Sequence, residues 1–120
     1  MSTVEVTKDN FEKTIEDNAL VFFDFWAPWC APCRFFGPVF EKASDKYPDA
    51  VFAKINTEDQ PELAAALNIN SIPTLMVFKE QIGVFAQPGA LPEPALEELI
   101  GKVQELDMDM VREQLKARKN

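Results

Sequence analysis

The segment ALVFFDFW, residues 19–26, restricts the fold of this chain more than any other feature. In an extended strand alternate side chains point to opposite faces, and here both faces are apolar. One face carries Leu20, Phe22 and Trp26, and the other carries Val21, Phe23 and Phe25. A strand that is apolar on both faces belongs in the middle of a sheet, with helices covering both sides. Asp24 lies on the same face as Phe22 and is the single polar exception.

Apolar patterns in the rest of the chain predict helices and strands in alternation. Strands are predicted at residues 3–6, 51–56, 74–78 and 84–87, and helices at residues 7–18, 30–47, 59–67 and 92–106. Thr7 is the expected N-cap of the first helix, and the sequence DQPE from Asp59 to Glu62 is expected to form a capping box before the third. The resulting order is βαβαβ, then α, then ββα. Alternating units favour parallel strands and the last hairpin adds antiparallel ones. We therefore predict an α/β fold with a mixed central β-sheet and helices on both faces.

A length of 120 residues is that of one domain. We assign residues 1–106 to this domain and residues 107–120 to a C-terminal helical extension or tail of the same domain. Met110, Val111 and Leu115 keep a helical spacing in that tail. We expect a solvated or frayed helix there, and a segment that docks a partner is the alternative.

The composition excludes several classes of function. A net charge of −8 argues against nucleic acid or an anionic membrane as a partner, since both require a basic surface. No apolar stretch approaches the ~20 residues needed to span a bilayer, and the N-terminus lacks the pattern of a signal peptide. We therefore expect a soluble protein of a reducing compartment, the cytoplasm. The absence of histidine excludes Cys–His and Ser–His hydrolase mechanisms and His-ligated zinc sites.

Cys30 and Cys33 are the only cysteines, and they fall within one helical turn of each other. A disulfide that closes so short a loop constrains the unfolded chain little, so it does not hold the fold together. The spacing indicates redox chemistry or metal binding. Two thiolates are half of a tetrahedral zinc site, and without histidine the other ligands would have to be carboxylates or come from a second chain. The remaining alternative is that the two cysteines have no chemical role and are only small, buried apolar side chains.

Several segments far apart in the chain resemble segments of the thioredoxin family. DFWAPWCAPC, residues 24–33, is similar to the thioredoxin active-site segment, and SIPTL, residues 71–75, is similar to the loop that faces it. Pro38 lies where thioredoxins kink the following helix, and PGAL, residues 88–91, resembles their last substrate-lining loop. The resemblance covers residues 3–106. It implies the thioredoxin fold and the activity of a general protein-disulfide reductase, which needs no bound cofactor or metal.

Three positions depart from the thioredoxin pattern. Ala31 stands where glycine is commonest, Ser71 stands where glycine is frequent, and Glu80–Gln81 replaces an Asn-Gly-like turn. None of these departures removes a chemical group. Ala31 lies between the cysteines, so the redox potential is the property that it is placed to alter.

The resemblance implies a role for each polar group near the cysteines. Cys30 would be an exposed attacking nucleophile, because a helix N-terminus stabilises a thiolate, and Cys33 would be the more buried resolving cysteine. Asp24 would lie beneath the pair and exchange a proton with Cys33, since burial raises the pKa of a carboxyl. Lys54 would lie near Asp24. The alternatives are that Asp24 is a structural acid paired with Lys54, or that Lys54 is a solvated residue of its strand.

The resemblance also implies a shallow apolar groove around Cys30 that binds substrates. Its residues are Trp29, Pro32, Ile72, Pro73, Gly89 and Ala90. Pro73 is expected to be cis and to pack against the active disulfide. Ile72 is expected to offer backbone groups to an extended substrate segment, as an added strand would use them.

The implied partners are disulfide-containing protein substrates and, as electron donor, an NADPH-dependent thioredoxin reductase. We expect a monomer that binds neither nucleic acid nor membrane. Two other functions stay open at this point. One is a disulfide oxidase or isomerase, and the other is a non-enzymatic accessory subunit that only binds through the groove.

Overall fold

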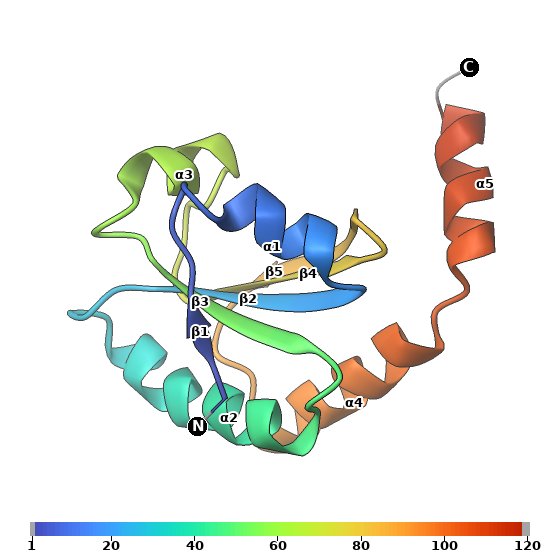
Figure 1. The fold of residues 1–120 in the computed structure, drawn as a ribbon. Coiled ribbons are helices and arrows are strands. Elements are labelled where there is room, and N and C mark those ends of the chain that lie inside the picture. Colours follow the sequence, from blue (N-terminus) through green and yellow to red (C-terminus); the bar gives the residue numbers. More distant parts are fainter. Residues whose placement is uncertain (1, 119–120) are drawn as a thin grey trace.

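A computed structural model describes residues 2–118 and shows a five-stranded mixed β-sheet covered by helices on both faces (Figure 1). The strands are β1 (Val4–Glu5), β2 (Leu20–Trp26), β3 (Val51–Asn56), β4 (Thr74–Lys79) and β5 (Ile82–Pro88). The helices are α1 (Phe11–Asp17), α2 (Ala31–Lys46), α3 (Pro61–Ala66), α4 (Glu93–Glu105) and α5 (Met108–Arg118). The predicted order of elements and fold class are confirmed.

The sheet has the strand order β1-β3-β2-β4-β5, so β2 is central, as its apolar pattern predicts. β1 and β2 run parallel to β3, whereas β4 is antiparallel to both β2 and β5. Helix α2 crosses over the sheet between β2 and β3, which is what a parallel pair requires. Glu80 and Gln81 form the tight connection between β4 and β5, both with positive φ (51° and 70°).

Each face of β2 is packed against its own apolar layer. Helices α2 and α4 cover one face, and α1 and α3 cover the other (Figure 1). Phe22 faces the α2/α4 layer, where its ring stacks on Phe52 with a centroid distance of 4.8 Å. Phe23 faces the other layer and packs against Phe11 and Phe78. Asp24 therefore belongs to the α2/α4 side of the sheet, in the layer that also holds the cysteines.

The expected N-cap of the first helix is wrong. Helix α1 begins at Phe11, and the residue at its N-cap is Asn10, not Thr7. The Asn10 side-chain oxygen accepts a hydrogen bond from the backbone N–H of Thr7 at 2.7 Å, and the Thr7 hydroxyl accepts one from the N–H of Asp9. These bonds form a turn before the helix, because Thr and Asn side chains compete for nearby backbone groups.

The expected capping box before α3 is also wrong. The N-cap of α3 is Gln60, and Pro61 follows as the first helical residue. Proline favours that first position, because its fixed φ suits a helix and the N–H that it lacks would have had no partner there. The cap thus falls one residue after Asp59, whose carboxylate accepts a hydrogen bond from the Gln60 side chain at 2.9 Å.

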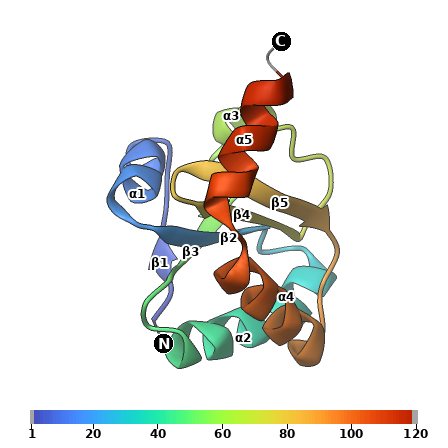
Figure 2. The same ribbon diagram turned by 90° about the vertical axis from the view of Figure 1, so that its right-hand side faces the viewer.

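The C-terminal extension forms helix α5, which rises from the end of α4 along the side of the molecule (Figures 1 and 2). Met108 at its start is only 4% exposed. Arg112 pairs with Glu80 at 2.8 Å, which ties α5 to the β4–β5 turn. The Lys79 ammonium donates to three main-chain carbonyl oxygens at the end of α4, at 2.8 to 3.0 Å. The extension is thus a helix that is anchored at Met108 and through the Arg112–Glu80 pair, while residues 112–118 are exposed, in agreement with the expected solvated helix. The boundary at residue 106 stays a prediction, and Met1 and residues 119–120 lie outside the described residues.

Among residues 2–118, no helix has both the length and the apolar character needed to cross a bilayer.

Met108→Ala should lower the free energy of unfolding by about 2–3 kcal/mol, since it removes a buried side chain and leaves a cavity. Met110, two residues later, is 59% exposed and provides a matched control. Met110→Ala should change the free energy of unfolding by less than about 0.5 kcal/mol. Urea unfolding of both variants checks the prediction, and equal small effects would show that α5 does not pack on the domain in solution.

Candidate active site

The two cysteines lie where β2 leads into α2. Cys30 has an extended backbone and is the N-cap residue of α2, while Cys33 lies in its first turn. Their sulfur atoms form a disulfide, with the two Cα atoms 5.2 Å apart. The Cys33 backbone N–H donates to the Cys30 Sγ at 3.2 Å. An N–H at a helix N-terminus has no partner within the helix, so Cys30 supplies one with its sulfur.

The expected difference in exposure between the cysteines is not found in this disulfide form. Cys30 is 4% exposed and Cys33 is 5% exposed. Both pack against Ala27, Trp26 and Ile72, which surround them from β2 and the loop before β4. The disulfide bridges only two intervening residues and holds the two sulfur atoms side by side. The exposed fractions of Cys30 and Cys33 are therefore nearly the same. What separates them is their place relative to the helix, because only Cys30 receives the N–H of its partner.

The loop before β4 faces the disulfide. The Ile72–Pro73 peptide bond is cis, as the resemblance implies. The carbonyl oxygen of Ile72 lies 3.7 Å from the Cys30 Sγ. Pro73 is buried, and its carbonyl oxygen accepts a hydrogen bond from the Gly89 N–H at 2.8 Å. Gly89 has a φ of 109°, a conformation that side chains disfavour.

Most of the predicted groove residues are exposed. Trp29 is 66% exposed, and Pro32, Gly89 and Ala90 are also exposed, while Ile72 is half-buried. The Trp29 indole N–H donates to the carboxylate of Glu58, in the loop after β3. This bond fixes the orientation of a large exposed ring beside Cys30. The predicted groove residues come from three segments: the start of α2, the loop before β4 and the loop after β5, which the Gly89–Pro73 hydrogen bond joins to the second.

Asp24 is fully buried on β2, and neither of its carboxylate oxygens has a hydrogen-bond donor among the described residues. Burial raises its pKa to about 7, because removal from water penalises the charged form. The charge of Lys54 opposes this rise, and the charge of Glu41 adds to it. Asp24 is therefore able to gain and lose a proton near neutral pH.

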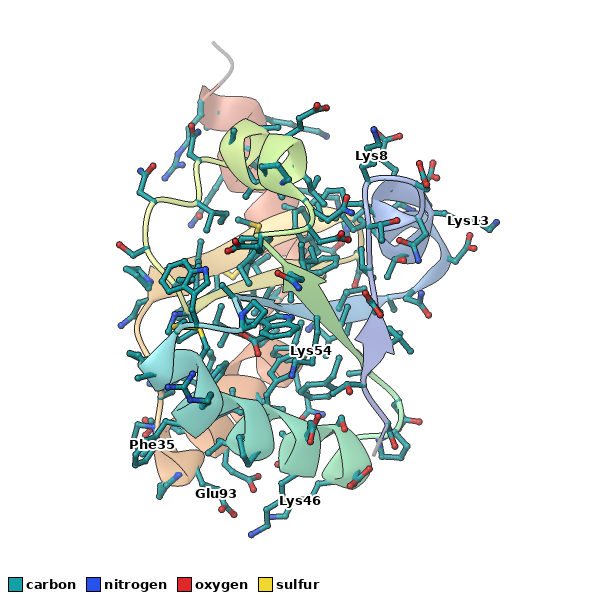
Figure 3. All side chains as sticks on the ribbon, turned by 90° about the vertical axis from the view of Figure 1, so that its left-hand side faces the viewer. Lys8, Lys13, Phe35, Lys46, Lys54 and Glu93 are labelled. Atoms are coloured by element: carbon teal, nitrogen blue, oxygen red, sulfur yellow. A yellow bond between two sulfur atoms is a disulfide. The ribbon has the colours of Figure 1, made fainter. Side chains whose placement is uncertain are left out.

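Lys54 lies beside Asp24, since the two residues are partners in the register of β2 and β3. Its side chain extends from β3 toward α2 (Figure 3). The ammonium lies 3.9 Å from a carboxylate oxygen of Glu41 and 4.9 Å from the centroid of the Trp26 ring. No ion pair joins Lys54 to Asp24 in the described part of the chain. The expected proximity is confirmed, and the alternative of a structural Asp24–Lys54 pair is not supported.

Comparisons with known proteins agree with this geometry. The Thioredoxin family model matches residues 2–102. A putative thioredoxin 2 of Streptomyces coelicolor is 62% identical over 111 residues, which cover 92% of this chain and 83% of the relative. A thioredoxin of Porphyra purpurea is 43% identical over 104 residues, covering 85% of this chain and 97% of the relative. The chain belongs to the thioredoxin family.

Solved structures of other thioredoxins have the same architecture. A mutant thioredoxin from Halobacterium salinarum matches with a TM-score of 0.81 at 33% identity, covering 88% of this chain and 94% of that one. A Plasmodium falciparum thioredoxin matches with a TM-score of 0.77 at 37% identity, covering 83% of this chain and 98% of that one. Together with the Cys30–Cys33 disulfide, family membership makes this thioredoxin-family chain a thiol–disulfide oxidoreductase.

Sequence reasoning missed three residues near the thioredoxin-type site: Gly37, Glu41 and Glu58. Gly37 and Glu41 follow Cys33 at intervals of four residues, so Cys33, Gly37 and Glu41 lie on one face of α2. They line a cavity of about 210 Å³ together with Trp26 and Lys54. The spacing was visible in the sequence, but only the packing of α2 over β3 shows that this face meets a lysine. Glu58 had no signal in the sequence, because its contact with Trp29 joins two separate loops.

Asp24→Asn should make the protein more stable above pH 7. The folded carboxyl keeps its proton up to about pH 7, whereas an unfolded one loses it near 3.9. Between these values the folded state binds more protons than the unfolded state. The free energy of unfolding of the wild type therefore falls as pH rises through that window and stays low above it. The separation of the two pKa values corresponds to on the order of 4 kcal/mol, a cost that the neutral Asn avoids.

Urea unfolding of the oxidised protein at about pH 5 and about pH 8.5 measures this effect. Asp49→Asn is the matched control, since Asp49 is exposed in the turn after α2. The control should show no comparable gain at the higher pH. An Asp24→Asn variant that is less stable than the wild type at the higher pH would mean that a partner stabilises the Asp24 carboxylate.

Proposed function

We propose that this chain is a general protein-disulfide reductase in which Cys30 is the nucleophile and Cys33 the resolving cysteine. The observation that carries the proposal is the N-cap position of Cys30, whose sulfur accepts the N–H of Cys33. In the reduced protein the same N–H and the positive end of the α2 dipole favour a thiolate on Cys30 over one on Cys33. The neighbouring Pro32 adds no cation that would stabilise the thiolate further, which suits a reductant.

The first step is attack of the Cys30 thiolate on a disulfide of the substrate protein. A bond forms between the Cys30 sulfur and one substrate sulfur, and the substrate disulfide breaks. The other substrate sulfur leaves as a thiolate and takes a proton. The product is a mixed disulfide between Cys30 and the substrate.

The second step releases the substrate. Asp24 accepts the proton of the Cys33 thiol, a role suited to a carboxyl with a pKa of about 7. The Cys33 thiolate attacks the Cys30 sulfur, the mixed disulfide breaks, and the second substrate sulfur leaves as a thiolate, which takes up the proton that Asp24 accepted. Two electrons have then passed to the substrate, and the protein holds the Cys30–Cys33 disulfide seen in this structure.

The loops at the disulfide support binding of an extended substrate segment. The backbone of Ile72 stands beside the Cys30 sulfur and can pair with a passing strand. Trp29, Pro32, Gly89 and Ala90 offer exposed apolar contacts and few charges. Backbone hydrogen bonds do not depend on the side chains of the substrate, so this surface can bind segments around many different protein disulfides.

Return to the dithiol form requires two electrons from a donor outside the chain. An NADPH-dependent thioredoxin reductase is the donor that we propose, because thioredoxin-family members use one. The reaction belongs in a reducing compartment such as the cytoplasm, where such a donor keeps thiols reduced. We propose that the protein acts there as a monomer, since one chain contains all of the groups that the two steps need.

The protein should accelerate the reduction of insulin by dithiothreitol, and also by NADPH with a thioredoxin reductase. The Cys30→Ser/Cys33→Ser double variant is the control and should give no acceleration. Persisting activity in that control would favour the accessory-subunit function. A reduction potential near the −270 mV typical of thioredoxins is expected for the Cys30–Cys33 pair, and a value near about −120 mV would indicate an oxidase.

The two single cysteine variants should fail in different ways. Cys33→Ser keeps the nucleophile and lacks the resolving thiol, so it should accumulate mixed disulfides with a model substrate. Cys30→Ser leaves only a thiol that lies inside the first turn, so it should form almost none. Non-reducing electrophoresis with mass spectrometry measures both. Equal trapping by the two variants would overturn the assigned roles.

A further inference from the structure

The position of the Lys54 ammonium is the observation that the two reaction steps leave unexplained. Lys54 and Asp24 are register partners on adjacent strands and lie on the same face of the sheet. Buried charges in proteins are ordinarily paired, so a lysine in this position would be expected to pair with an ionised Asp24. Here the ammonium instead lies 3.9 Å from a Glu41 carboxylate oxygen and 4.9 Å from the centroid of the Trp26 ring.

Helix α2 passes close over the Lys54 side chain at Gly37. Gly37 lies between Cys33 and Glu41 on the face of α2 that meets β3. A Cβ at Gly37 would have the Lys54 Nζ as its neighbour, at 3.8 Å. That separation is an ordinary van der Waals contact, so the Lys54 ammonium lies directly beneath this face of α2, one helical turn before Glu41.

The other charged groups near Asp24 do not account for the position of Lys54. On β1, Glu5 is in register with Lys54 but is exposed, and no ion pair joins the two in the described chain. On α2, Arg34 lines the same cavity and donates to the carbonyl oxygen of Pro28 at 3.1 Å. On β4, the register partner of Asp24 is the apolar Leu75. Glu41 is thus the acid that faces both Lys54 and the cavity.

We propose that Glu41 is a positioning residue, which holds the Lys54 ammonium near Trp26 and so keeps it from pairing directly with the Asp24 carboxyl. This role rests on the proposed function, because it matters only if Asp24 exchanges a proton with Cys33. A carboxyl paired with a lysine would stay ionised and could not return a proton at neutral pH. Glu41 acts through Lys54 and contacts neither the cysteines nor a substrate.

The test is the titration of the Asp24 carboxyl carbon by carbon NMR in the oxidised protein. Glu41→Gln keeps the size of the side chain and removes its charge, so Lys54 is free to turn toward Asp24. The pKa of Asp24 should then fall by about one unit, the effect of an opposite charge within hydrogen-bonding reach. The pH profile for release of the mixed disulfide should move to lower pH in the same direction.

A double-mutant cycle separates action through Lys54 from a direct effect of charge. In a Lys54→Met background, Glu41→Gln should move the Asp24 titration by less than half as much as in the wild type. Glu98→Gln is the matched control, since Glu98 pairs with Lys102 at 3.2 Å on the exposed surface of α4. It should leave the titration unchanged.

An unchanged Asp24 titration in Glu41→Gln, or an equal fall in both backgrounds, would overturn the positioning role. The titration uses the oxidised protein and needs no turnover. A wild type that fails to reduce insulin would therefore count against the proposed function alone, while the titration would still decide the role of Glu41.

Discussion

Strand β2 has a neighbour on each edge and an apolar layer on each face, so a carboxyl placed along it is cut off from bulk water. The chemistry of the site depends on that burial. Burial of β2 raises the pKa of Asp24. The same buried strand also holds in place the segment that leads to Cys30, the N-cap residue of α2. A proton acceptor and a nucleophile are therefore positioned by one strand. Either would lose its special environment if the strand moved to an edge of the sheet.

The central strand and the redox pair could be predicted because their signals are local. The alternation of side chains over the eight residues of ALVFFDFW predicts which of them point to each face of β2. Two cysteines within one helical turn predict the reactive pair without any knowledge of tertiary contacts. The expected caps at Thr7 and Asp59 failed for a related reason. Asn10 instead accepts the N–H of Thr7 in a turn before α1, and Pro61 takes the first helical position of α3, so each helix begins after the predicted cap.

The parts of the site that sequence did not predict are contacts between separate elements. Lys54 could be placed on the correct face of its strand, yet the direction of its ammonium depends on Glu41, which belongs to a helix that crosses above it. The bond from Trp29 to Glu58 likewise joins two loops that only the folded sheet brings together. The near-equal exposure of the two cysteines follows from closing the disulfide, which draws both sulfurs against the same apolar residues.

The sheet ends in two edges that are protected in different ways. An edge strand presents unpaired N–H and C=O groups, which can template pairing with another chain. On one side, β1 is only two residues long and offers little to pair with. On the other side, β5 is seven residues long, and α5 lies beside its first half, where Val111 and Leu115 share a cavity with Ile82. The C-terminal helix thus stands in the way of any strand that would add to β5 along Ile82–Val84.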